Sequence, residues 1–160
     1  MPDTVLPAAS PEDAAVLALL DRLRPGDWLA FASADAPLAH GTPTLRVDAP
    51  LEQVAGAILP LLPISRHTWD PLLRWPAAEA DPDIVDLTFA MQGLASDGSG
   101  RRMTATPLDD DLLRVAAEAV DAAIRVAWTG APFLFLVCVG GGAHQATDLT
   151  APRPALAEAG

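Results

Sequence analysis

Short apolar runs alternate along this chain with segments in which apolar residues recur at helical spacing. The runs 27–32 and 133–139 are almost wholly apolar, which is typical of strands covered on both faces of a sheet. A cap residue followed by proline or acidic residues marks helix starts, as at Ser10-Pro11-Glu12. We expect helices over about 10–23, 51–61, 81–94 and 109–122, and strands over 27–32, 44–47, 72–75, 102–106, 124–129 and 133–139. This alternation predicts a single-domain, three-layer α/β/α fold with a mostly parallel or mixed sheet.

The domain is expected to span residues 1–142. Three glycines, 140–142, end the last apolar run, and residues 143–160 are rich in alanine and proline, so we expect a flexible tail there. The polar, glycine-bearing stretch 96–101 is expected to be a flexible loop. A chain of 160 residues is long enough to bury one substantial core.

The composition narrows the functional classes. The formal net charge is −11, all ten basic residues are arginine, and neither lysine, tyrosine nor asparagine occurs. A chain this acidic repels phosphate backbones, so nucleic-acid binding is not expected. No apolar run is long enough to span a membrane, and the N-terminus lacks the order of a signal peptide, so we expect a cytoplasmic protein. The single cysteine, Cys138, lies in an apolar run and is expected to be a buried structural thiol.

The loop after the strand 27–32 is the first candidate site. In α/β proteins, ligands bind beyond the carboxyl ends of parallel strands. The polar residues available around this strand are Asp27, Ser33, Asp35 and His40. Asp27 follows a Pro-Gly turn, and we expect its carboxylate to accept loop N–H groups. Asp35 lies deeper in the loop and is the better ligand candidate.

A second polar loop, 64–69, carries Arg66, His67 and Trp69. If it meets the first loop at one sheet edge, two histidines and an arginine face a shared cleft. No metal site is expected, because the histidines have no paired spacing and no cysteine partner. Three aspartates at 109–111 are explained by the dipole at a helix N-terminus rather than by a metal.

The order of these features resembles the D-ribose pyranase and L-fucose mutarotase family from about Ser10 to Gly141. Each piece is weak alone, and the ordered set carries the resemblance. The matching segments are Ser10-Pro11-Glu12 through Leu20, Gly26-Asp27 to Ala32, Pro37-Leu38-Ala39-His40, Arg46-Val47-Asp48, Ile58-Leu59-Pro60-Leu61, Pro71-Leu72-Leu73, Asp81-Pro82-Asp83, Trp128-Thr129-Gly130 and the strand after Pro132-Phe133.

The resemblance implies an enzyme that interconverts ring forms of free sugars without a cofactor, within a ring-like homo-oligomer, often a decamer. It also implies a histidine and an aspartate as acid–base groups, and a tyrosine and an asparagine that hold the sugar. In this sequence those four positions hold Pro25, Ser33, Phe133 and Phe135. Proline and phenylalanine cannot transfer protons, so the inherited machinery is absent. An apolar wall favours a ligand less polar than a free sugar.

We therefore expect a cofactor-independent isomerase or cyclase that acts on a cyclic small molecule. Asp35, His40 and His67 are the predicted catalytic residues. The predicted substrate contacts are Asp27, Ser33, Arg66, Trp69, Phe133 and Phe135. Two alternatives stay open: a non-catalytic protein that binds a small molecule or forms an oligomer, and a sugar mutarotase with relocated acid–base groups.

Overall fold

The computed structural model describes residues 14–77 and 81–140, and these form one six-stranded sheet with helices on both faces. The strand order is β2-β5-β1-β6-β3-β4. Among the described strands, β6 alone runs opposite to its neighbours β1 and β3, and the other pairs are parallel. The strands are β1 (Trp28–Ala32), β2 (Thr44–Arg46), β3 (Leu72–Trp75), β4 (Thr106–Pro107), β5 (Ala122–Arg125) and β6 (Leu134–Cys138).

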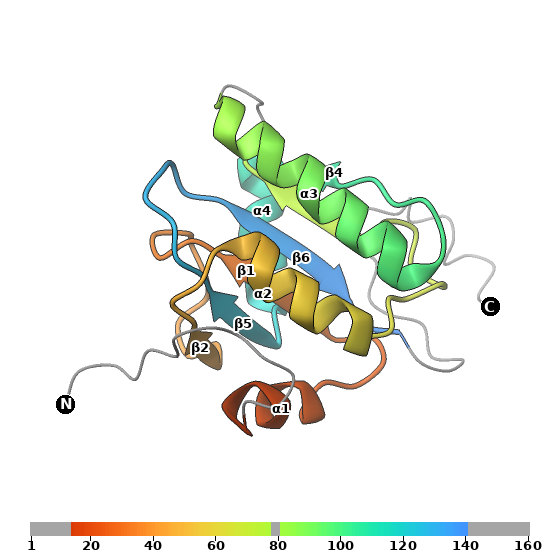
Figure 1. Cartoon of the computed structure of the whole chain (residues 1–160). Coiled ribbons are helices and arrows are strands. Elements are labelled where there is room, and N and C mark those ends of the chain that lie inside the picture. The colour runs from red at the N-terminus through yellow and green to blue at the C-terminus, as the bar shows by residue number, and fades with distance from the viewer. Residues whose placement is uncertain (1–13, 78–80, 141–160) are drawn as a thin grey trace.

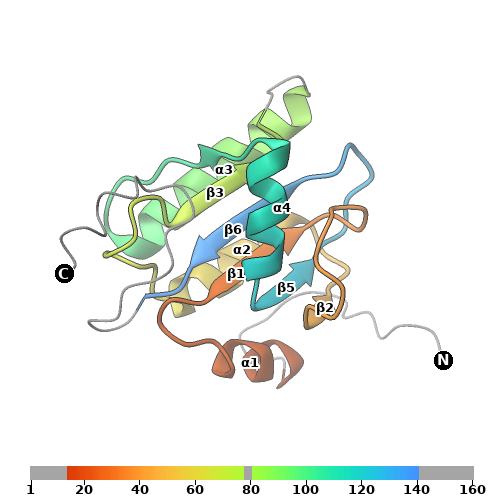
Figure 2. The same ribbon diagram turned by 180° about the vertical axis from the view of Figure 1, so that it is seen from behind.

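Helices cover the two faces of the sheet unequally. α2 (Leu51–Ile58), which continues as the 3₁₀ turn η1 (Leu59–Leu61), and α3 (Pro82–Ser99) lie on the face seen in Figure 1. α4 (Asp110–Ala119) crosses the opposite face, seen in Figure 2. α1 (Ala14–Asp21) packs at the β2 side. The predicted three-layer α/β/α fold with a mixed sheet is confirmed.

Alternate residues of each central strand point into two separate cores. In β1, Leu29 and Phe31 join the core under α2 and α3, while Trp28 and Ala30 join the core under α4. All five residues of β1 and of β6 are buried, as predicted for strands covered on both faces. Cys138 is buried in β6, which confirms the structural thiol.

The predicted flexible loop at 96–101 is wrong, because α3 continues to Ser99. Gly98 is the reason the helix can continue here: a Cβ at this position would lie 3.3 Å from the carbonyl oxygen of Leu59, so the missing side chain lets α3 pack on η1. The helix ends at Gly100, whose φ of +72° suits a left-handed cap.

The predicted strand 102–106 is mostly wrong, because side chains of α3 bind the backbone that a neighbouring strand would have bound. Ser96 Oγ accepts the N–H of Met103 at 2.8 Å, and Gln92 Oε1 accepts the N–H of Ala105 at 2.9 Å. Strand pairing is limited to β4. The last two strands begin at Ala122 and Leu134, and α4 ends at Ala119, so those boundaries differ from the prediction by one to three residues.

The helix start at Ser10, the boundary at residue 142, the tail 143–160 and His144 lie outside the described residues. Within the described residues, no helix combines the length and apolar character needed to cross a membrane.

Candidate functional site

The two predicted catalytic histidines lie far apart in one chain. His40 lies in the loop that leads into β2, and His67 lies in the loop that leads into β3. Three strands separate β2 from β3, which corresponds to roughly 19 Å at about 4.8 Å per strand spacing. The strand order thus separates the two loops within a single chain, and a shared cleft for His40, His67 and Arg66 stays a hypothesis. Sequence spacing could not reveal the strand order that separates them.

The loop after β1 is held in place by hydrogen bonds. Ser33 is buried, and its Oγ accepts the N–H of Phe133 at 3.0 Å. The guanidinium of Arg125, at the end of β5, donates to the carbonyl oxygens of Ser33 and Ala36. Burial lowers the pKa of the Arg125 guanidinium, and the nearby Asp35 carboxylate opposes that shift. Ser33 thus fixes the loop, whereas the exposed Asp35 carboxylate is available to a ligand.

Phe133 and Phe135 are fully buried in the core under α2 and α3. Their ring centroids lie 5.7 Å apart, and the Trp128 ring meets Phe133 edge-on at 5.4 Å. Neither ring is among the residues that line the α4 pocket or the amino-edge pocket described below, and the contacts seen for both rings are packing contacts. A role for them in substrate binding stays a prediction. The resemblance located these positions but not the direction of their side chains.

An apolar pocket lies on the other face of the sheet, between α4, the loop after β1 and the end of β3. We call it the α4 pocket; its volume is about 440 Å³. A volume in this range suits a small organic ligand. Pro37, Leu38, Ala39, Trp75, Leu113 and Ala117 form its walls, and Asp110, Arg114 and Glu118 supply its charged groups.

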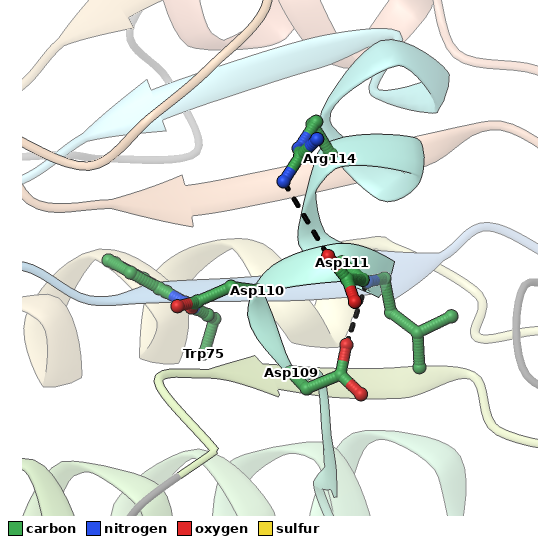
Figure 3. A network of polar contacts seen from close by, with 6 residues as sticks. Trp75, Asp109, Asp110, Asp111 and Arg114 are labelled. Atoms are coloured by element: carbon green, nitrogen blue, oxygen red, sulfur yellow. Dashed lines mark hydrogen bonds and ion pairs between the residues drawn. The ribbon is translucent and has the colours of Figure 1, made fainter.

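The charged rim of the α4 pocket is organised by the first turn of α4 (Figure 3). The Nε1–H of Trp75 donates to Asp110 Oδ1 at 3.0 Å. Asp109 caps the helix, because its Oδ1 accepts the N–H of Leu112 at 2.8 Å. Asp111 lies 3.5 Å from the guanidinium of Arg114, with both side chains highly exposed. The three aspartates thus serve the helix terminus, as predicted, and Asp110 also faces the pocket.

A second pocket, of about 520 Å³, lies at the amino ends of β1 and β5, beside α1. We call it the amino-edge pocket. Asp27 Oδ2 accepts the N–H of Arg24 at 2.9 Å, which confirms the predicted turn-stabilising role. Asp121 Oδ2 accepts the N–H of Trp28 at 2.9 Å. Its lining includes Asp21, Arg22, Arg24, Asp27 and Asp121, so it is far more polar than the α4 pocket.

The Asp121 carboxyl is perturbed by this setting. Burial raises its pKa above the ordinary 3.8, the hydrogen bond from Trp28 opposes the rise, and the Asp27 carboxylate adds to it. One carboxyl that keeps its proton more readily, next to another carboxylate, is the arrangement that acid–base catalysis uses. Asp121 was not among the residues predicted from the sequence, because nothing in the sequence pairs it with Asp27.

Arg66, His67 and Trp69 lie in a turn that is closed by hydrogen bonds to Ser65. Ser65 Oγ accepts the N–H groups of His67 and Thr68, each at 3.2 Å. Arg66 and His67 are exposed, and Trp69 is 68% exposed. None of the three lines the α4 pocket or the amino-edge pocket. A role in ligand binding for them stays a prediction.

No three histidine, cysteine, aspartate or glutamate side chains within residues 14–77 and 81–140 gather closely enough to hold a metal ion. On β3 and α4, sequence reasoning missed six residues of the α4 pocket: Trp75, Asp110, Leu113, Arg114, Ala117 and Glu118. A signal was present: in 110–118, the charged residues Asp110, Arg114 and Glu118 recur at i, i+4 spacing beside the apolar face of one helix.

No family model and no curated protein matches this sequence. Several solved structures are similar to this chain. The fucose mutarotase of Streptococcus pneumoniae, solved with L-fucose, is 18% identical with a TM-score of 0.68, and the match covers 84% of this chain and 98% of that one. FucU from Bifidobacterium longum is 18% identical with a TM-score of 0.67 over 82% and 95% of the two chains.

RbsD of Bacillus subtilis, solved with D-ribose, is 14% identical with a TM-score of 0.61, and the match covers 84% of this chain and 98% of that one. These matches span nearly the whole length of the matched proteins, and at such identities the likeness concerns the fold. The chain thus has the fold of the ribose pyranases and fucose mutarotases, as its sequence resemblance predicted.

Proposed function

We propose that the chain binds a cyclic small molecule, less polar than a free sugar, in the α4 pocket and isomerises, opens or closes its ring without a cofactor. The observation that carries this proposal is the composition of the pocket. Leu38, Leu113 and Ala117 offer apolar walls, whereas carboxylates stand only at the rim. Such a pocket gains from burying carbon, and it lacks the dense set of donors and acceptors that a free sugar requires.

The chemistry of ring opening needs one group to take a proton from a hydroxyl and another to give a proton to the ring oxygen. Asp110 and Glu118 are carboxylates on the pocket lining and are the nearest bases. Asp35 and His40 lie on the loop that also supplies Pro37, Leu38 and Ala39 to the pocket wall. We assign the acid–base roles to the four residues Asp35, His40, Asp110 and Glu118. His67 does not line the α4 pocket and has no role there within one chain.

The predicted homo-oligomer belongs to this proposal as well. Arg66, His67 and Trp69 are exposed on the loop that leads into β3. In an oligomer, these side chains of one copy would reach the site of a neighbouring copy. Trp69, with 68% of its surface exposed, is the large apolar side chain that such a contact would cover. Sedimentation velocity of the wild type and of Trp69→Ser tests this part: a monomeric wild type contradicts it.

A suitable probe for the main proposal is 2-hydroxytetrahydropyran, a cyclic hemiacetal without the other hydroxyls of a sugar. NMR titration measures its binding, and magnetisation exchange between its ring and open forms measures turnover. We expect exchange faster than in buffer, lowered at least about tenfold in Asp110→Asn, Glu118→Gln or His40→Ala if that group transfers the proton. Ala117→Leu, which fills the pocket, should abolish binding.

The outcomes separate the alternatives. Absence of binding, or binding that persists in Ala117→Leu, contradicts the proposed site. Saturable binding without faster exchange contradicts the catalytic half and favours a non-catalytic binding protein. Val115→Leu is the matched control for Ala117→Leu, because it enlarges an exposed side chain on the same helix and should leave binding unchanged.

The amino-edge pocket supports a second candidate, a sugar mutarotase with relocated acid–base groups. Its lining is polar, and Asp27 and Asp121 offer two carboxyls in different environments. D-Ribose and L-fucose are the probes, and anomer exchange by NMR is the measurement. Exchange accelerated in the wild type, but not in Asp121→Asn, would favour this candidate. Exchange no faster than in buffer would remove it.

A further inference from the structure

The charges on the α4 pocket are unbalanced. Asp110 and Glu118 contribute two negative groups, and Arg114 contributes one positive group. The Arg114 guanidinium lies 3.5 Å from Asp111, a carboxylate outside the pocket lining, and its side chain is 81% exposed. Arg114 is therefore partly neutralised by a residue that the ligand does not meet. The pocket itself presents an excess of negative charge.

Both carboxylates can accept further hydrogen bonds. Trp75 occupies Oδ1 of Asp110, and among the described residues no hydrogen bond reaches Oδ2. Glu118 has no ion-pair partner within the described part of the chain. A carboxylate accepts and cannot donate, and it binds a charged N–H donor more strongly than a neutral one. The rim thus favours a ligand that donates from a cationic group.

The indole of Trp75 also favours a cationic ligand. It lies on the pocket lining, half-buried, with its Nε1–H directed at Asp110, as Figure 3 shows. The face of an indole attracts a cation, at about 0.5–1 kcal/mol at exposed sites. An aromatic wall beside the Asp110 carboxylate is a combination that suits an ammonium group attached to an apolar body.

The charge of the whole chain adds a long-range contribution. A net charge of −11 on 160 residues repels anions and attracts cations toward any open pocket. His40, which follows the pocket residue Ala39, is the other titratable group of this loop beside Asp35. Neither reverses the sign, because Asp35 adds a negative charge and His40 can add at most one positive charge.

We infer that the ligand of the α4 pocket is a cyclic, largely apolar molecule that carries a protonated amine. This inference rests on the proposed function, since it concerns the same pocket. The walls formed by Leu38, Leu113 and Ala117 receive the apolar ring, and the ammonium lies beside Trp75 and Asp110. Glu118, about two turns further along α4, adds negative charge to the same lining. The ligand class therefore differs from a neutral sugar in charge as well as in polarity.

Three probes of nearly equal size test the sign of the charge: benzylammonium, benzyl alcohol and benzoate, at pH 7 and low salt. NMR titration gives the three dissociation constants. We expect benzylammonium to bind about fivefold to tenfold more tightly than benzyl alcohol, and benzoate to bind more weakly than both. The preference for the cation should shrink at 0.5 M NaCl, because screening acts on exposed charges.

Two variants test whether the preference for benzylammonium comes from the α4 pocket. Glu118→Gln and Asp110→Asn should each lower the preference for benzylammonium while leaving benzyl alcohol almost unaffected. Asp86→Asn is the matched control: it removes the same charge from α3, on the opposite face of the sheet, and should leave the preference unchanged. A preference lost equally in Asp86→Asn would mean that only the net charge matters, and would overturn the assignment.

Failure of this inference is distinguishable from failure of the proposed function. Benzyl alcohol binding as tightly as benzylammonium, with both abolished by Ala117→Leu, leaves the apolar pocket intact and overturns the charge preference. If none of the three probes binds, or if their binding persists in Ala117→Leu, both the pocket and the charge preference are overturned.

Discussion

The sheet face under α2 and α3, called the closed face below, is covered by two helices, whereas the face under α4, called the open face, is covered by one helix with the α4 pocket beside it. On the closed face, two helices and η1 pack on Phe31, Phe133 and Phe135, which have no exposed surface. On the open face, the ten residues of α4 cross strands that present small side chains such as Ala30 and Ala32. The α4 pocket therefore forms beside the single helix of the open face. A ligand can bind there without disturbing the core under α2 and α3.

The largest effect is expected from a matched pair of core truncations, one on each face. Leu87→Ala removes a buried side chain of α3, and Leu113→Ala removes one of α4 that also lines the pocket. We expect Leu87→Ala to lower the free energy of unfolding by about 2–5 kcal/mol and Leu113→Ala by less, because water can enter the space at Leu113. Urea unfolding followed by circular dichroism measures both.

Binding should show the reverse order. Leu113→Ala should weaken binding of 2-hydroxytetrahydropyran, whereas Leu87→Ala should leave it unchanged in the folded protein. Equal costs for the two truncations, together with equal binding, would mean that the faces do not differ in the way described.

Arg125→Gln is expected to have an intermediate effect on the free energy of unfolding. It tests whether the loop beside the α4 pocket depends on this side chain. The guanidinium holds the carbonyl oxygens of Ser33 and Ala36, and the loop continues into the pocket wall at Leu38. Loss of these hydrogen bonds should lower the free energy of unfolding by about 1–3 kcal/mol and weaken binding in the α4 pocket. The exposed Arg102→Gln, in the segment after α3, should do neither.

The smallest effect on the free energy of unfolding is expected from Asp121→Asn, a change in the amino-edge pocket. Its raised pKa means that the folded state holds this proton at pH values where the unfolded state has released it. Its contribution to stability is therefore present below about pH 3.8 and is lost as the pH rises through the folded pKa. Relative to the wild type, Asp121→Asn should gain stability as the pH rises from 3.8 toward 7.

Urea unfolding at several pH values measures this difference, with Asp86→Asn as an exposed control. A difference between Asp121→Asn and wild type that does not vary with pH would contradict the assignment of the perturbed carboxyl. It would also weaken the case for the amino-edge pocket as a proton-transfer site.

The elements that could be predicted from the sequence are those whose signal is local. The strand 72–75 and the buried strands around Phe31 and Leu136 follow from short apolar runs. The start of α4 follows from Asp109 as its cap. α3 was predicted too short, because the contact that lets Gly98 continue the helix comes from Leu59, which is distant in sequence.

The site was less predictable, because it depends on strand order and on the direction of side chains. Asp35 and His40 belong to the loop that borders the α4 pocket, but Phe133 and Phe135 point into the closed core, and His67 lies three strands away from β2. Trp75 and Asp110 are 35 residues apart and meet only because β3 and α4 share one edge of the fold. Such pairings have no local signature.

The central position of β6 has a consequence for how the chain is made. β1, β5 and β2 form one ribbon and β3 and β4 another, and within the described residues these ribbons share strand pairing only through β6. Since residues 134–138 follow every other described strand, a nascent chain on the ribosome presents two unjoined ribbons with open edges until this segment emerges. The sheet is therefore completed only after β6, the last of the described strands, has been synthesised.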